Sequence, residues 1–469
     1  MDRHEKINKA LSVDMEMLLR YNKPGPRYTS YPTAPQFTEA FASRQFMDEV
    51  VQTNQSENPA DLSLYFHLPF CDTLCYFCGC TMIITRNRER IDEYVNYIIK
   101  EVELVSRYIS PGRKVAQLHW GGGTPTYLDP KQIRRLFDVI RDNFDFQDNA
   151  EIGVEIDPRG MTEDHLDALK DVGFNRASMG VQDFDVKVQE AVNRLQPEAL
   201  TRWAFDGLRQ RGFESINLDL IYGLPFQTVQ SFEKTLNQII DISPDRLAVF
   251  NYAHVPWMKK HQTVIKKEAL PTAHEKLRIL KSSIERLTSD EYVYIGMDHF
   301  ARPDDSLTRA LHEKRLYRNF QGYSTKHGCD LYALGMSGIS QLANVYAQNV
   351  KEIPSYYSAL DKGQFATERG YRLNADDRLR RRVIMQLMCN FELRKADIEE
   401  QFSIDFDDYF SDALANLEPM NADGLVDYQN GKILVTEMGH LLIRNIAMAF
   451  DSYLNKAKEQ DTPMYSKTV

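Results

Sequence analysis

Short apolar runs alternate with longer amphipathic stretches between residues 62 and 256. The runs are rich in Val, Ile, Leu, Phe and Tyr, a composition typical of strands that are buried on both faces. The stretches between them repeat apolar residues at the i, i+3, i+4 and i+7 spacing of helices that cover a sheet. We therefore predict six strands separated by helices, with the strands at 62–70, 115–120, 151–156, 176–181, 215–221 and 246–252.

Six successive strand–helix units predict a parallel sheet with its helices outside. An open, curved three-quarter barrel and a doubly wound sheet both satisfy this pattern, and periodicity alone does not separate them. The series continues with a helix over 274–287 and a seventh strand over 292–297.

A second module begins near residue 370. Its pattern predicts three helices, two strands around the hairpin turn Asn430-Gly431 and a closing helix, at 383–389, 395–402, 407–414, 425–428, 432–436 and 440–453. Helices with a hairpin resemble a winged helix, which could bind DNA. Residues 396–431, however, contain ten Asp or Glu and no Lys or Arg. Because DNA binding needs a basic surface, we expect a packing or lid module instead.

Composition and charge narrow the classes of protein that remain. The net charge of -10 at pH 7 argues against a general nucleic-acid binder, which needs a basic surface. No apolar run approaches the ~18–20 residues of a membrane span, and residues 1–20 lack the continuous apolar segment of a secretory signal. We therefore expect a cytoplasmic protein without nucleic-acid or membrane partners.

Four of the six cysteines lie within ten residues, in a loop directly after the first predicted strand. Such crowding in a reducing compartment indicates metal or redox chemistry rather than a disulfide framework. Cys71, Cys75 and Cys78 form a CxxxCxxC pattern. Three such thiolates hold three corners of a four-iron cluster and leave the fourth iron open to an outside ligand.

Zinc is the alternative metal. Zinc ribbons, however, pair two CxxC motifs that are far apart in the sequence, and the cysteines outside this loop stand alone. Cys80 is not an expected ligand, because the 78–80 spacing is too tight for two corners of one cluster.

Polar residues and glycines also mark the predicted carboxyl ends of the strands, where ligands gather in α/β folds. Residues 121–123, all glycine, end the second strand and let a backbone approach a ligand closely. Glu155 ends the third strand, Gln182 ends the fourth, and Asp219 lies within the fifth, where a carboxylate is costly to bury without a partner. Arg194 could meet a carboxylate in a fork geometry. Each of these also has an ordinary structural interpretation as a turn, a solvated acid or a helix-surface arginine.

These motifs together resemble one enzyme family. A CxxxCxxC loop after the first strand is the signature of radical S-adenosylmethionine enzymes. Narrower segments are GPRYTSYP at 25–32, YFHLPFC at 65–71, CGC at 78–80, HWGGGTPT at 119–126, MGVQDF at 179–184, DLIYGLP at 219–225 and GMDHFARP at 296–303. As a set they are similar to the oxygen-independent coproporphyrinogen III oxidases (dehydrogenases) of heme biosynthesis over nearly the whole chain. A related branch binds heme as a chaperone without decarboxylase activity. Residues 27–32 and Cys80 favour the oxidase branch.

The resemblance implies a fold, a division of the chain and a cofactor set. The fold is an open three-quarter (β/α)6 barrel, and the expected parts are an N-terminal arm (1–60), the radical enzyme barrel with an extension (61–369) and a mainly helical C-terminal domain with a hairpin (370–469). The cofactors are a 4Fe-4S cluster on the three cysteines and two S-adenosylmethionine molecules. The first of these would contact Tyr65, Gly122, Glu155 and Ile339, and the second Phe77, Gly123, Thr124, Gln182, Arg194, Asp219 and Ala253. The residues expected to be catalytic are Tyr65, Glu155, Gln182, Arg194 and Asp219.

The resemblance also implies the reaction and its partners. A 5′-deoxyadenosyl radical would start the oxidative decarboxylation of two propionates of coproporphyrinogen III to vinyl groups, giving protoporphyrinogen IX. An external electron donor and an acceptor would be needed, and we expect a monomer. Because the substrate carries four carboxylates, arginines near the barrel mouth should anchor it, and Arg27 and Arg302 are the candidates.

Overall fold

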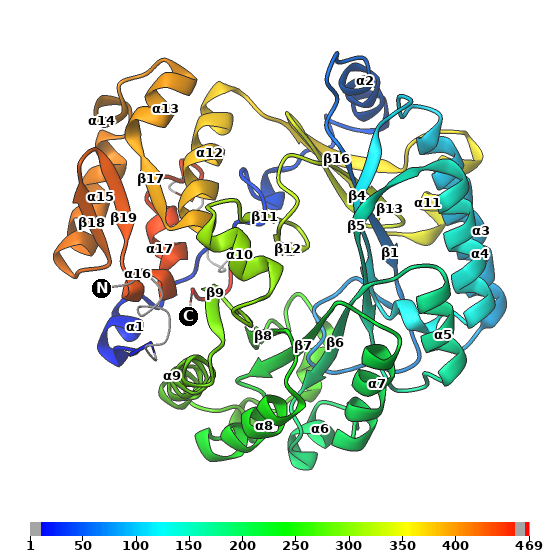
Figure 1. The fold of residues 1–469 in the computed structure, drawn as a ribbon, viewed down its shortest axis with the longest axis horizontal. Coiled ribbons are helices and arrows are strands. Elements are labelled where there is room, and N and C mark those ends of the chain that lie inside the picture. The colour runs from blue at the N-terminus through cyan, green and yellow to red at the C-terminus, as the bar shows by residue number, and fades with distance from the viewer. Residues whose placement is uncertain (1–10, 455–464, 469) are drawn as a thin grey trace.

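Six parallel strands form the centre of a curved twelve-stranded sheet (Figure 1). The structure, a computed structural model, describes residues 11–454 and 465–468. The central strands follow one another in chain order: β1 (Leu62–Leu68), β4 (Lys114–Gly122), β5 (Asp145–Ile156), β6 (Arg176–Gln182), β7 (Ser215–Tyr222) and β8 (Arg246–Asn251). All six predicted strands are therefore confirmed, with ends that differ by a few residues.

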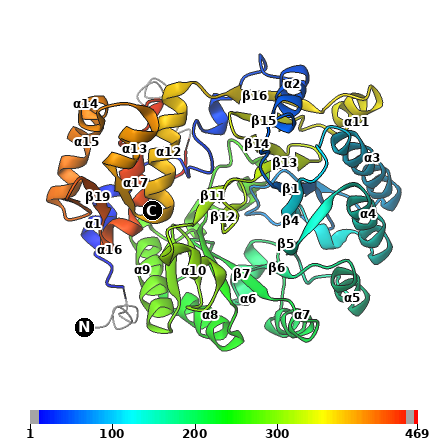
Figure 2. The same ribbon diagram turned by 45° about the horizontal axis from the view of Figure 1, so that its top comes forward.

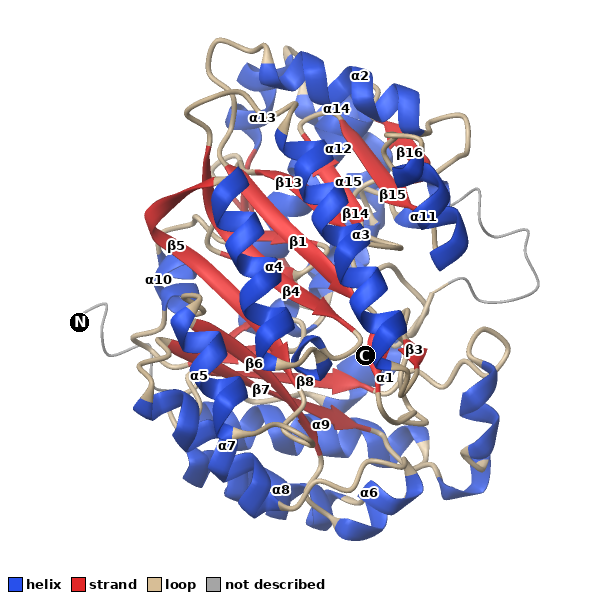
Figure 3. Cartoon of the chain, turned by 90° about the vertical axis from the view of Figure 1, so that its right-hand side faces the viewer, coloured by secondary structure: helices blue, strands red, loops and turns tan. Residues whose placement is uncertain are grey.

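Helices cover the outer face of these strands (Figures 2 and 3). They are α3 (Arg88–Ser106), α4 (Pro130–Asn143), α5 (Glu163–Asp171), α6 (Val186–Ala191), α7 (Glu198–Gln210), α8 (Val229–Ile242) and α9 (Ala273–Ser289). In α3, an apolar stripe that includes Ile91, Val95 and Val102 is buried, and each such side chain contributes about 1.5–3 kcal/mol through burial. Asn87 begins this helix by accepting a hydrogen bond from the Arg90 amide (3.1 Å).

The central strands do not close into a full barrel. β1 pairs with β4 but not with β8, and the strand order never reverses as it does in a doubly wound sheet. The three-quarter barrel is therefore the correct one of the two architectures left open by the periodicity.

Both edges of this barrel carry further strands that the sequence pattern largely missed. On the β1 side, β13 (Asp330–Leu334) runs parallel to β1 and leads into an antiparallel series of β14 (Ile339–Leu342), β15 (Val345–Asn349) and β16 (Thr367–Arg372). On the β8 side lie β10 (His299–Ala301) and β9 (Val293–Gly296), which is the predicted seventh strand. α10 (Ser306–His312), the hairpin β11–β12 (Tyr317–Asn319 and Gly322–Ser324) and α11 (Ile353–Asp361) connect these strands.

The C-terminal module packs beside the barrel and contains the predicted hairpin (Figure 1). Its elements are α12 (Ala375–Asn390), β17 (Glu392–Arg394), α13 (Lys395–Phe402), α14 (Phe406–Tyr409), α15 (Ser411–Ala422), β18 (Val426–Gln429), β19 (Lys432–Val435), α16 (Glu437–Leu441) and α17 (Ile443–Met448). Asn430 and Gly431 both have positive φ, as the two-residue turn requires. The predicted closing helix is two shorter helices, and the predicted boundary at residue 370 falls within β16.

The N-terminal arm is ordered around two helices, α1 (Met15–Tyr21) and α2 (Ser43–Asn54). Between them the chain is buried in part: Tyr28 and Tyr31 are almost inaccessible, and the Tyr28 hydroxyl donates to Asp451 of the C-terminal module (2.9 Å). The arm therefore joins the two larger parts. Across the described ranges, no helix combines the length and the hydropathy needed to cross a membrane.

Candidate active site

The predicted cysteine loop leaves the sheet directly after β1. β2 (Phe70–Cys71) and β3 (Ile83–Ile84) pair in parallel and close the loop at its base. Neighbouring loops hold its backbone from outside through five bonds: Asn193 Nδ2 to Leu74 O (2.8 Å), Tyr76 N to Val192 O (2.9 Å), Gln262 Nε2 to Phe77 O (3.1 Å), His261 Nε2 to Cys78 O (2.7 Å) and Lys259 Nζ to Cys80 O (3.1 Å). None of these bonds uses a thiol, so the backbone is fixed while the sulfur atoms remain available as ligands.

The Cys75 sulfur lies against two guanidinium groups. Arg159 Nη2 donates to it at 3.5 Å and Arg194 Nη1 at 3.7 Å. Asp157 pairs with both arginines, at 2.6 and 3.0 Å. Burial disfavours the charged form of Asp157, but the two guanidinium groups lower its pKa below the ordinary value. Both guanidinium groups therefore direct N–H donors at the sulfur of a predicted cluster ligand. Asp157 and Arg159 were not among the predicted site residues, although Asp157 lies at the end of the third strand just as Glu155 does.

The other two thiols differ in their surroundings. Burial raises the pKa of Cys71 to about 12, whereas hydrogen bonding with the Cys80 thiol lowers the pKa of Cys78. In the described part of the chain, no three His, Cys, Asp or Glu side chains converge on a point where one metal ion could sit. A four-iron cluster does not require that convergence, because each thiolate binds a different iron. The three thiols on one fixed loop therefore fit a cluster.

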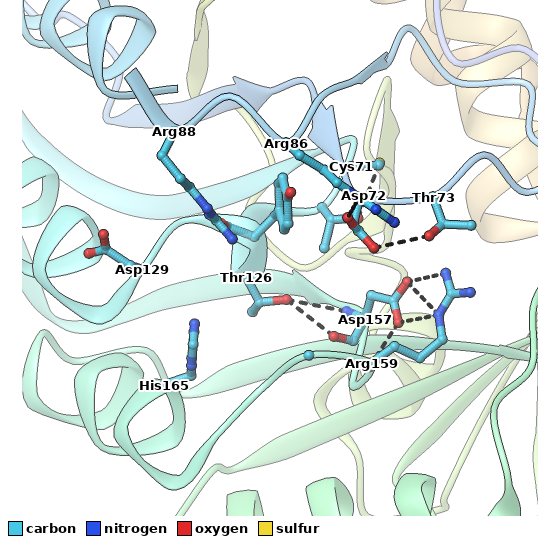
Figure 4. A pocket seen from close by; sticks show the side chains of 13 residues that line it. Cys71, Asp72, Thr73, Arg86, Arg88, Thr126, Asp129, Asp157, Arg159 and His165 are labelled. Atoms are coloured by element: carbon cyan, nitrogen blue, oxygen red, sulfur yellow. Dashed lines mark hydrogen bonds and ion pairs between the residues drawn. The ribbon is translucent and has the colours of Figure 1, made fainter. Parts of the chain in front are cut away.

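A cavity of about 540 Å³ opens beside Cys71 (Figure 4). Cys71 Sγ is hydrogen-bonded to Thr124 Oγ1 at 3.2 Å, and Asp157 and Arg159 lie paired on the opposite wall. Gly123 lies against the loop, where a Cβ would be 2.4 Å from the backbone just before Cys71. The close approach therefore places the β4 end directly against the cysteine loop.

Glu155 lies at the end of β5 and faces the barrel interior. It accepts a hydrogen bond from Gly122 N (3.0 Å) and lies 3.5 Å from His119 Nε2. Burial disfavours its charge, but these two donors hold the pKa of Glu155 below its ordinary value. Gly122 has φ +115°, and a Cβ there would lie 2.6 Å from the His67 ring, so the position requires glycine. The Tyr65 hydroxyl completes the group through a 3.1 Å bond to His67 Nδ1.

Asp219 lies within β7 and faces the same interior. Asn217 Nδ2 (2.7 Å) and Ser178 Oγ (3.1 Å) donate to its carboxylate, while burial raises the pKa of Asp219 to about 6. Glu155 and Asp219 both line a cavity of about 220 Å³ inside the barrel. The two carboxylates offer acceptors to the hydroxyl and amino groups of a ligand in this space.

The remaining predicted cofactor residues lie at the same end of the barrel. Gln262 joins Phe77 and Ala253, because its amide donates to both carbonyls (3.1 and 3.3 Å). Gln182 ends β6 in the left-handed region, at φ +69°. Ile339 begins β14, which β13 separates from β1. Along the sheet, Ile339 lies two strands from β1, whereas Asp219 on β7 lies four strands from it.

The two arginines suggested as substrate anchors have different positions. Arg27 forms a partly buried ion pair with Asp298 and lies over the ring of Phe250, which lines the barrel cavity. Arg302 lies at the opposite end of the barrel, because β10 runs antiparallel to β8 and brings the Arg302 amide to the Asp245 carbonyl (2.8 Å). The prediction that Arg302 lies near the barrel mouth is therefore wrong.

Comparisons with known proteins connect these features. Residues 65–239 match the model of the Radical SAM superfamily, and residues 373–442 match that of the HemN C-terminal domain. The chain is 46% identical over 459 residues to the oxygen-independent coproporphyrinogen III oxidase of Synechocystis sp., covering 97% of both chains. It is 50% identical over 449 residues to the Escherichia coli protein of the same name, covering 95% of this chain and 97% of that one. The solved structure of the E. coli coproporphyrinogen III oxidase HemN, described as a radical SAM enzyme, superposes with a TM-score of 0.90 and 47% identity over 95% of this chain and 100% of that chain.

Proposed function

This chain belongs to the oxygen-independent coproporphyrinogen III oxidases, a family within the radical SAM superfamily, and we propose that it converts two propionates of coproporphyrinogen III to vinyl groups, giving protoporphyrinogen IX. The observation that carries this proposal is the position of the three-cysteine loop beside Glu155 and Asp219 at one end of the barrel. The cluster ligand Cys71 lines one cavity at this end of the barrel, and Glu155 and Asp219, the acceptors for a cofactor's polar groups, line a second one inside the barrel. The relatives named above carry the oxidase name, which favours the enzyme over the heme-binding chaperone.

Cys71, Cys75 and Cys78 would hold the 4Fe-4S cluster, with S-adenosylmethionine as the outside ligand of the open iron. When bound, these cofactors supply a 5′-deoxyadenosyl radical, the agent that can attack the unactivated β-carbon of a propionate. The protein binds and orients them. Arg159 and Arg194 keep positive charge beside Cys75, and Glu155 and Asp219 offer acceptors to the polar groups of the cofactor.

The residues divide into two candidate S-adenosylmethionine sites, and we propose that both are occupied in turnover. Glu155 and Tyr65 belong to the first, beside the cysteine loop. Asp219 and Arg194 belong to the second, where one carboxylate and one guanidinium could bind an amine or hydroxyl and a carboxylate, respectively. Titration of reconstituted protein should then approach two molecules per chain.

The proposed reaction is tested anaerobically with coproporphyrinogen III. A reductant and an electron acceptor are added, because we propose that both come from outside the chain. We also propose that the chain acts as a monomer. Carbon dioxide and a divinyl product should form. Deuterium placed at the propionate β-carbons should appear in 5′-deoxyadenosine. Product without deuterium transfer would contradict the radical route, whereas tight heme binding without product would support the chaperone.

A further inference from the structure

Exposed apolar side chains are concentrated on one face of the molecule. Nine large apolar residues are exposed among the described residues, and six of them belong to α6 and the loops after β6, β7 and β8: Val186, Leu195, Phe226, Trp257, Met258 and Val264. Trp257 and Met258 are 58% and 66% exposed. Single exposed apolar residues need no explanation, but a group of them marks an interaction surface.

This face shares a small core with the cysteine loop. Val192, Tyr252 and Ile265 belong to a buried cluster that is separate from the main core, and Tyr76 and Phe77 of the cysteine loop pack against it. The face is therefore the outer surface of the structure that supports the cluster ligands.

Lysines accompany the exposed apolar residues along the chain, most densely after β8, whereas Asp185 and Glu190 flank Val186 and Lys187. Residues 257–268 contain four lysines and one glutamate, although the whole chain has a net charge of -10. Lys260, Lys266 and Lys267 are exposed, and no ion pair joins them to a carboxylate within the described residues. Lys187 adds a further positive charge 4.4 Å from the ring of Phe226. The face is thus locally basic on an acidic protein.

The same segment contacts the cysteine loop directly. Lys259 Nζ donates to Cys80 O at 3.1 Å and His261 Nε2 to Cys78 O at 2.7 Å. His261 belongs to a short 3-10 helix, Lys260–Val264, whose other residues include the exposed Lys260 and Val264. Only His261 would separate a partner bound to this helix from the backbone of the predicted cluster ligand Cys78.

We propose that this docking face, formed by Val186, Lys187, Leu195, Phe226, Trp257, Met258, Lys260, Val264, Lys266 and Lys267, receives an acidic one-electron carrier protein. The inference rests on the proposed function, which needs one electron from outside. The carrier is oxidised by one electron, the cluster is reduced by one electron, and no bond forms between the proteins.

Aromatic and Met side chains together with charged groups are typical of protein interfaces, and the basic charge would steer an acidic partner. A membrane surface is the other class of partner for a basic, apolar face, but it would not explain the position over the cluster loop.

The test uses the full reconstituted enzyme and charge reversal at Lys260→Glu, Lys266→Glu and Lys267→Glu. The rate at which reduced flavodoxin, an acidic flavoprotein, bleaches the cluster absorbance should fall at least about tenfold at low salt, while the rate with dithionite should be unchanged. A second variant, Trp257→Ala with Met258→Ala, should weaken flavodoxin binding by about tenfold without changing its salt dependence. The matched control carries the same charge change on exposed residues elsewhere, Lys131→Glu, Lys351→Glu and Lys362→Glu.

Three results would overturn the docking face. These are an unchanged flavodoxin rate in both variants, an equal loss in the remote control, and an equal loss with dithionite. Loss of binding to anionic vesicles with no change in the flavodoxin rate would assign the face to a membrane instead. Because cluster bleaching needs no porphyrinogen, these results are independent of whether the parent enzyme forms a vinyl product, which tests the proposed function separately.

Discussion

The two ends of the same barrel hold their charged side chains differently. Near the amino ends of the strands, the charges are closed into ion pairs: Arg113–Asp330 (2.6 Å), Arg209–Asp245 (2.5 Å), Arg176–Glu151 (3.2 Å) and Arg246–Asp305 (3.0 Å). Near the carboxyl ends, Glu155 and Asp219 line a cavity that also reaches Glu151, Arg176 and Arg246, but no arginine of the described ranges pairs with them, and His119, Gly122, Asn217 and Ser178 hold their carboxylates. One end therefore stabilises the fold, and the other keeps acceptors directed towards a ligand.

The largest expected effect belongs to the carboxyl end. Replacing Cys75 with Ala removes one of three thiolates and should abolish cluster binding and turnover. Cys80→Ala should retain most of the iron, because Cys80 is not an expected ligand. Iron and sulfide content after anaerobic purification measures both. Equal iron loss in the two variants would contradict the open-iron site.

The amino end should give the opposite result, with a large effect on stability and a small one on activity. Arg113 and Asp330 are almost fully buried, so Arg113→Met leaves an unpaired buried carboxylate and should cost about 3–5 kcal/mol in the free energy of unfolding. Cluster content and KM should be unchanged. Denaturant unfolding of the apoprotein measures the loss.

Two further variants sharpen this prediction. Arg113→Met combined with Asp330→Leu should recover most of the stability, because neither charge is then left alone. Arg134→Met breaks an exposed pair with Asp171 and should cost at most about 1 kcal/mol. If Arg113→Met lowers turnover while the free energy of unfolding stays unchanged, the division between the two ends is wrong.

The two ends also differ in how far the sequence could predict them. Buried strands with apolar patterns, and a cysteine spacing that few other sites use, were both visible, so the six strands, the loop and Glu155 at a strand end were predicted, whereas the choice of a barrel over a doubly wound sheet came from the family resemblance. The position of Asp157 after the third strand was visible, but its pairing with Arg159 and Arg194 was not, because tertiary folding brings Arg194 to it. Arg302 was misplaced because the antiparallel direction of β10 leaves no mark on the local pattern.

The edge strands were missed for a related reason. β13 and β15 are buried along their whole length and are only five residues each, so their pattern cannot be distinguished from that of a buried turn of helix. Pairing with β1 and β14, respectively, decides their structure. The local sequence predicts a helix or strand well when the spacing of its apolar residues matches the faces that the fold buries.

A smaller effect is expected from Asp219, which distinguishes the two candidate cofactor sites. Asp219→Ala removes an acceptor for a charged or polar group and should weaken one of two S-adenosylmethionine sites by about 10–100-fold. The cluster spectrum should not change, because the bonds of Asp219 go to Asn217 and Ser178 rather than to the cysteine loop. Calorimetric titration of parent and variant measures the stoichiometry. Saturation at one molecule in the parent would contradict the second site.

The smallest expected effect is a pH dependence that should separate the two carboxylates at this end. Burial raises the pKa of Asp219 to about 6, so its carboxylate is almost fully ionised at pH 7.5 and about one-quarter ionised at pH 5.5. A raised acid pKa means that the folded protein favours the protonated form. The stability contributed by Asp219 is therefore present at low pH and is lost as the pH rises through about 6. Ligand binding has the opposite sign, because the ionised form is the better acceptor. Affinity at the second site should fall about fourfold between pH 7.5 and 5.5.

The pKa of Glu155 is lowered, so affinity at the first site should stay constant over this range. Asp219→Asn, which cannot ionise, should bind more weakly but equally at both pH values, and an unchanged pH dependence in this variant would assign the titration to another group.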